Sequence, residues 1–129
     1  MKSFRELLSG AIALALALAL PLCALAEEFP EGAAPVDPAQ LAQHLGGKTF
    51  TVKLKDGNSW RVEYKSNGYF FFNHSLGASD TGQWRGEESK LCTKGLRLIS
   101  ASCNEVRMKD GALVLKRDNG DVIQFVEKQ

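Results

Sequence analysis

The chain has 129 residues, with 16 basic and 15 acidic side chains and a formal net charge of +1. This length fits one domain, and the basic residues form no cluster or stripe. We therefore expect neither nucleic acid nor an anionic membrane surface as a partner.

The first 26 residues have the order of a signal peptide. Lys2 and Arg5 form a basic start, an apolar run continues to Leu22, and Ala24 and Ala26 supply the small residues that signal peptidase recognises. We predict cleavage after Ala26, which would make the protein periplasmic or secreted and free of the membrane. Separately, we expect a monomer. The alternative is an uncleaved anchor, although the apolar run is shorter than the roughly 20 residues of a membrane-spanning helix.

Residues 27–36 are rich in proline, glycine and alanine and predict a flexible leader. A short helix should follow, because Asp37-Pro38-Ala39-Gln40 has the residues of a capping box and Gly46-Gly47 can end the helix. His44 on this helix is a candidate ligand or base. A surface histidine near the helix C-terminus, where the dipole favours its charge, is the simpler interpretation.

From Lys48 onward the apolar residues recur with period two, which indicates half-buried strands. Pairs typical of tight turns separate them: Asp56-Gly57, Asn67-Gly68, Asp110-Gly111 and Asn119-Gly120. Short strands with turn signals at this spacing predict an all-β domain over residues 37–129. We expect an antiparallel meander that forms a small barrel or strongly curved sheet, with the last strand pairing with an early one to remove an exposed edge.

Two cysteines, Cys92 and Cys103, remain once Cys23 has left with the signal peptide. In an oxidising compartment the pair predicts one structural disulfide. The alternative is a redox-active or metal-binding thiol pair. Neither cysteine belongs to a C-x-x-C motif and no histidine lies at ligand spacing, so we expect no metal.

Several motifs together resemble those of a family of small exported proteobacterial proteins of uncharacterised function. They are Gly47-Lys48-Thr49-Phe50, Asp56-Gly57 with Trp60, Gly82 with Trp84-Arg85, Leu91-Cys92 and Cys103. The most specific part is the Gly-x-Trp strand followed by the Leu-Cys pair and a second cysteine. The resemblance implies a signal peptide, one disulfide and an all-β fold, and it carries over no catalytic residue.

The sequence contains no Ser/His/Asp order, G-x-S-x-G, P-loop or H-E-x-x-H motif, so we assign no catalytic residue and no cofactor. Aromatic residues crowd the first half of the β region. They predict either ordinary packing on both faces of the sheet or an apolar ligand site at a barrel mouth. For that site we select Trp60, Tyr64 and Trp84, with Arg85 or Arg61 at the rim.

Two classes of function follow from this pattern. The first is a non-catalytic binding module for a small apolar ligand or for another envelope protein. The alternative is an envelope hydrolase that uses carboxylates such as Asp80 or Glu87, or an inhibitor of such hydrolases. A convergent pair of acids would favour the enzyme, whereas an aromatic cavity would favour the ligand binder.

Overall fold

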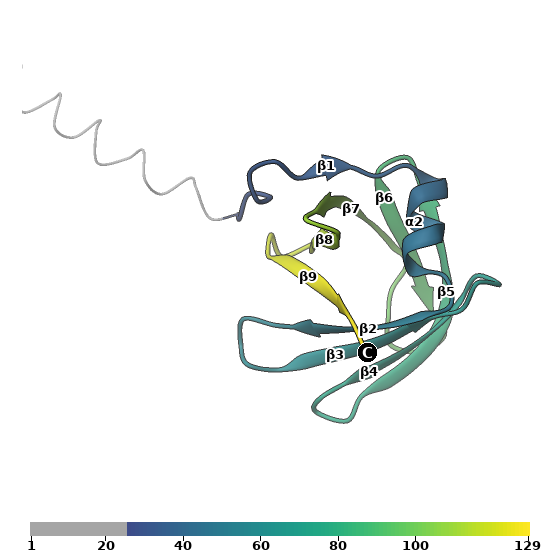
Figure 1. The fold of residues 1–129 in the computed structure, drawn as a ribbon. Coiled ribbons are helices and arrows are strands. Elements are labelled where there is room, and N and C mark those ends of the chain that lie inside the picture. Colours follow the sequence, from purple (N-terminus) through teal and green to yellow (C-terminus); the bar gives the residue numbers. More distant parts are fainter. Residues whose placement is uncertain (1–25) are drawn as a thin grey trace, which may run out of the picture.

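The computed structural model describes residues 26–129, so the predicted signal peptide, except for its last residue, lies outside the described residues. The described chain forms an antiparallel barrel with one short helix (Figure 1). The elements are β1 (Ala34–Pro35), α2 (Pro38–Leu45), β2 (Lys48–Lys53), β3 (Ser59–Tyr64), β4 (Tyr69–His74), β5 (Ser79–Glu87), β6 (Lys90–Gly95), β7 (Ser102–Lys109), β8 (Ala112–Lys116) and β9 (Val122–Glu127). Within residues 26–129, no helix is long and apolar enough to cross a membrane.

Strands β2 to β9 pair in chain order, each antiparallel to the next. The last strand then returns to the first, with Phe50 opposite Glu127 and Thr51 opposite Val126. This pairing closes the barrel and leaves no free edge between β2 and β9, which confirms the predicted all-β meander.

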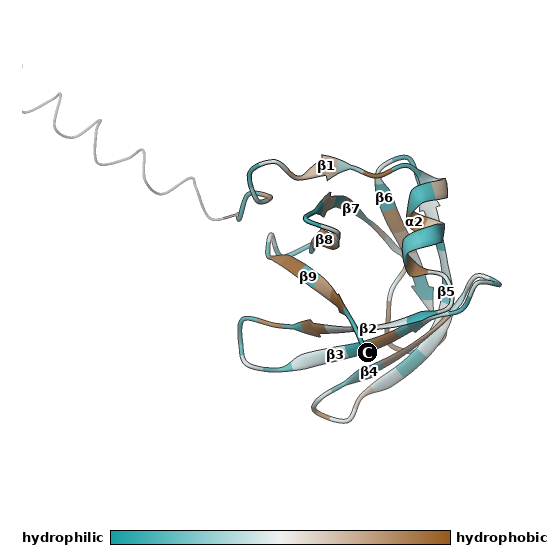
Figure 2. Cartoon of the chain, viewed as in Figure 1, coloured by the Kyte–Doolittle hydropathy of each residue, from teal (hydrophilic) through white to brown (hydrophobic). Residues whose placement is uncertain are grey.

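The predicted helix and its cap are present. The Gln40 amide donates to the Asp37 carboxylate (2.8 Å), and the Asp37 amide donates to the Gln40 side chain (3.1 Å), which is a complete capping box. The helix buries Leu41 and Leu45 and covers the end of the barrel at which β2 begins and β5 ends. Figure 2 shows apolar and polar parts side by side on α2. Close approach depends on Gly86, because a Cβ there would lie 3.0 Å from the Cα of Pro38.

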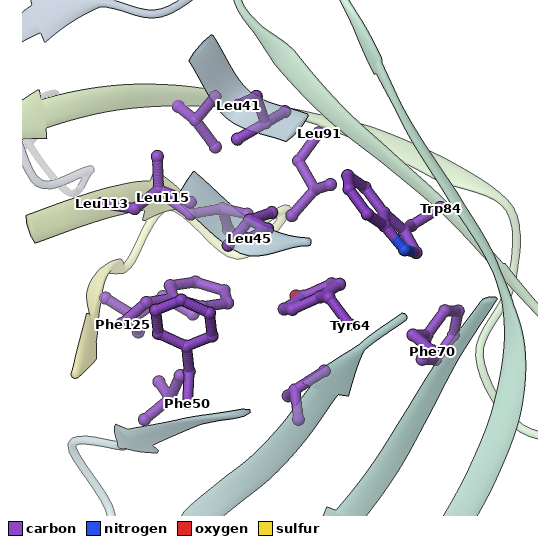
Figure 3. Packing of buried hydrophobic residues seen from close by; sticks show 14 of the residues in the cluster. Leu41, Leu45, Phe50, Tyr64, Phe70, Trp84, Leu91, Leu113, Leu115 and Phe125 are labelled. Atoms are coloured by element: carbon purple, nitrogen blue, oxygen red, sulfur yellow. The ribbon is translucent and has the colours of Figure 1, made fainter. Parts of the chain in front are cut away.

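Alternation along the strands fills the barrel with large side chains. One side chain in two points inward, and the inward set packs ring against ring and ring against aliphatic chain (Figure 3). Phe50 lies between Tyr64 and Phe125, with both ring centroids 6.1 Å away in edge-on geometry. This is a favourable arrangement for aromatic pairs, and it makes the helix-capped half of the barrel a packed core.

The segment predicted as a flexible leader makes defined contacts with the barrel. Its β1 pairs with the far half of β7, beyond the point where β6 stops pairing, and Val36 is 1% exposed. The Glu27 amide donates to the Gly120 carbonyl (3.1 Å), and the Arg107 guanidinium lies 4.5 Å from the Phe29 ring. A strand of two residues containing proline leaves no periodic signal, so the sequence alone indicated only a linker.

Cys92 and Cys103 form the predicted disulfide. The two residues lie directly opposite each other on β6 and β7 and face the outside of the barrel. Cys92 is buried and Cys103 is exposed. The covalent link therefore fixes the pairing of β6 and β7 just before the long connection between them, residues 96–101.

Candidate functional site

The two ends of the barrel differ. The helix covers one end, and four connections surround the other: residues 54–58, 75–78, 96–101 and 117–121. Between them lies an open cavity of about 370 Å³, which we call the mouth. A smaller space of about 80 Å³, the deep chamber, continues from it toward the core. Six residues line both spaces: Trp60, Phe72, Thr93, Ile99, Asn104 and Leu115.

One wall of the mouth is aromatic. Trp60 on β3 and Phe72 on β4 point inward from neighbouring strands and meet edge-on, with ring centroids 5.6 Å apart. The Arg117 guanidinium lies 4.9 Å from the Trp60 ring centroid, within the range of a cation–π contact. The same guanidinium is 3.7 Å from the Asp121 carboxylate. Arg117 therefore forms the rim beside Trp60 and is already paired.

The opposite wall is polar and internally bonded. The Asn104 amide group donates to the Asp118 carboxylate (2.8 Å) and to the Lys116 carbonyl (3.2 Å). The Ser102 hydroxyl donates to the Asn104 side-chain oxygen (3.2 Å). This network ties β7 to the connection that follows β8, so Asn104 acts as a fixed part of the wall.

Asp80 holds the 96–101 loop in place. Its carboxylate is 7% exposed and accepts hydrogen bonds from the consecutive amides of Ile99, Leu98 and Arg97, and from the amide of Thr81. These bonds, with the Ile99 amide as the largest cause, lower the pKa of Asp80 to about 2. The loop is thereby folded so that Ile99 lines the mouth and the deep chamber.

The structure brings together two of the four residues predicted as a ligand site. Trp60 lines both spaces and Tyr64 lines the deep chamber. Trp84 packs behind Tyr64 (5.4 Å between centroids) and donates its indole N–H to the Lys65 carbonyl, so it belongs to the closed half of the core. Arg85 is exposed on the outer face, where it pairs with Glu87 (2.9 Å).

Sequence reasoning missed most of the mouth. Asn104 and Ser102 give no signal because β7 has polar residues at both inward and outward positions. Arg117 lies in a turn, and Ile99 reaches the mouth only through the loop that Asp80 holds. Phe72 belongs to a run of four aromatic residues, and strand alternation is the signal that would have selected it.

The carboxylates proposed for an enzyme do not converge. Asp80 faces inward and Glu87 outward on the same strand, seven positions apart, so about 23 Å of chain separates them at about 3.3 Å per residue. This exceeds the spacing of acid pairs in glycosidases. Glu87 ends β5 and Glu88 lies in the turn before β6, as the sequence indicated.

His44 lies at the closed end, away from the mouth. Its ring packs 5.6 Å from that of Phe50, and its Nε2 is buried with no hydrogen-bond partner among the described residues. Burial, followed by the nearby Lys48 charge, lowers the pKa of His44. The predicted surface histidine is thus partly covered by the barrel.

The outer face of β4 carries exposed aromatic side chains. Tyr69 and Phe71 are 47% and 45% exposed. Phe71 also borders an open groove of about 450 Å³, together with Leu96 and Arg97 of the loop. A surface of this kind is typical of a docking site for another protein.

No family model matches the chain, and no curated protein or solved structure is significantly similar to it.

Proposed function

We propose that this protein is a non-catalytic binding module that takes one small, mainly apolar ligand into the open end of its barrel. One observation carries the proposal: the mouth continues into the deep chamber behind an aromatic wall of Trp60 and Phe72. A volume of about 370 Å³ falls within the usual range for small-molecule sites. A small barrel whose interior side chains leave room for one ligand is a recurrent arrangement.

We further propose that the protein acts in the periplasm or outside the cell, as a member of the small exported proteobacterial family that its motifs resemble. The order of the first 26 residues supports export. The Cys92–Cys103 disulfide supports it too, because such bonds persist in oxidising compartments.

A second candidate is docking on another envelope protein. The observation in its favour is the exposure of Tyr69 and Phe71 on the outer face of β4. The two proposals use opposite faces of the sheet, so variants can separate them.

The test is a titration with N-phenylnaphthylamine, an uncharged apolar fluorophore whose emission rises in an apolar site. We expect saturation at one equivalent. Thr93→Trp should abolish binding because Thr93 lines both spaces and an indole there would occupy the region that they share. Lys94→Trp is the matched control, since the next residue on β6 is exposed on the outside.

Equal binding by both variants would refute the proposed site and direct attention to Tyr69 and Phe71. Melting curves of the two variants establish that each is folded under the assay conditions.

A further inference from the structure

We infer that the ligand is an uncharged ring compound carrying one small hydrogen-bonding group, which points into the deep chamber toward the hydroxyls of Tyr64 and Thr93. This inference rests on the proposed function and gives the chemical class of the ligand.

Two hydroxyl-bearing residues, Tyr64 and Thr93, line the deep chamber. Tyr64 is 3% exposed and lines the deep chamber, and burial alone raises the pKa of its hydroxyl, with no hydrogen bond among the causes. Figure 3 shows the Tyr64 ring within the aromatic cluster, with its oxygen toward the middle of the barrel. Thr93 lines the same chamber. Because both residues line the chamber and a hydroxyl inside a protein usually has a partner, the polar group of a ligand can supply one.

The polar groups on the wall of the mouth are already hydrogen-bonded to one another. Asn104 uses its oxygen and its amide group within the wall, and Ser102 donates to it. Asn104 therefore has little capacity left for a ligand. The hydrogen-bonding capacity that remains is concentrated at Tyr64 and Thr93, in the chamber.

Arg117 and Asp118 are the charged residues that line the mouth. The Arg117 guanidinium contacts both the Trp60 ring and the Asp121 carboxylate. The Asp118 carboxylate accepts a hydrogen bond from the Asn104 amide group. An anionic ligand would have to displace Asp121 and would lie beside Asp118, whereas a cationic one would meet Arg117. A charge placed deeper would lose its hydration among apolar side chains. The site therefore disfavours both anionic and cationic ligands.

The deep chamber, at about 80 Å³, admits a hydroxymethyl or carbonyl group but no ring. An apolar cavity near 150 Å³ is enough for a benzene molecule, and the mouth is larger than that. A ring would thus lie in the mouth against Trp60 and Phe72, where edge-on or stacked contacts are favourable. Its polar group would point inward.

The experiment is displacement of bound N-phenylnaphthylamine by four compounds of matched shape: para-methylbenzyl alcohol, para-methylbenzoate, para-methylbenzylamine and para-xylene. We expect the alcohol to bind at least about tenfold more tightly than the carboxylate or the ammonium compound, because a charge in the site is poorly solvated. Tyr64→Phe should weaken binding of the alcohol about two- to tenfold, which corresponds to the loss of one hydrogen bond. It should leave the affinity for para-xylene unchanged.

Tyr69→Phe is the matched control, because Tyr69 is the other tyrosine in the chain and faces outward. Tyr64→Phe should also keep or raise the melting temperature, since it removes a polar hydroxyl from the mainly apolar lining of the chamber. If the charged compounds bound as tightly as the alcohol, or if Tyr64→Phe left the affinity for the alcohol unchanged, the inferred ligand class would be wrong. The proposal of a binding module would still stand. Failure of the fluorophore to bind at the mouth would overturn the proposed function and this inference with it.

Discussion

Removal of the disulfide should destabilise the protein by an amount set by the loop that it closes. Cys92 and Cys103 are 11 positions apart. For a loop of this length, the chain-entropy relation gives about 3 kcal/mol at 25 °C. A domain of this size changes its melting temperature by about 4–8 °C per kcal/mol. We therefore expect reduction, or replacement of both cysteines, to lower the melting temperature by about 12–24 °C.

The measurement is thermal unfolding followed by circular dichroism, with oxidised and reduced wild type beside the double-serine variant. Cys92 is buried, so serine there also buries a hydroxyl. The double-alanine variant separates that effect from loss of the cross-link. Each variant should melt identically with and without reductant. If oxidised and reduced wild type melted at the same temperature, the disulfide would contribute nothing to stability and the reasoning would be wrong.

Three further predictions test other parts of the fold. Asp80→Asn should remove a fall in stability between about pH 4 and pH 2. The folded-state pKa of Asp80 lies below that of the unfolded chain, so its contribution is present above pH 4 and lost as pH falls; acid unfolding of both proteins measures this. Gly82→Ala should cost about 1–3 kcal/mol or more in urea unfolding, because its Cβ would overlap the Lys94 carbonyl oxygen of the paired strand. Gly57→Ala is the comparison: its Cβ would meet no atom within 4 Å, so it adds only the backbone strain of a residue at φ 91° and should cost less. His44→Gln should remove a fall in stability below about pH 6.5, since the lowered pKa of His44 favours the folded state only while the ring is neutral. If the free energy of unfolding depended on pH in the same way in the variant, a group other than His44 would cause the fall.

Local rules predicted most of the fold. Alternation from Lys48, glycine turns such as Asn67-Gly68 and the capping box at Asp37 each act over a few residues, and the structure confirms these elements. Closure of the barrel followed from the need to pair the last strand, and β9 does pair with β2. The disulfide followed from two cysteines and an export signal.

The candidate site was predicted less well, because the choice of its residues did not follow strand alternation. Trp84 and Arg85 are neighbours in one strand, so their side chains point to opposite faces and cannot line the same cavity. Strict alternation selects Trp60 with Tyr64 on β3 and Phe70 with Phe72 on β4. Ile99 and Arg117 lie outside the strands, and no periodic pattern places them. Their positions depend on the carboxylate of Asp80 and on the contact with Trp60.

These contacts link the stability of the barrel to the proposed site. The disulfide and Asp80 hold the 96–101 loop from two directions: one fixes the strands at its ends, and the other binds three of its amides. Because the loop carries Ile99 into the mouth, losing either restraint should let that wall move. We expect the double-alanine cysteine variant and Asp80→Asn to bind N-phenylnaphthylamine more weakly at temperatures where both remain folded. His44→Gln, at the closed end, should bind as wild type does. Unchanged affinity in both loop variants would mean that the loop keeps its conformation without these restraints, and that Ile99 is positioned by its own packing in the mouth.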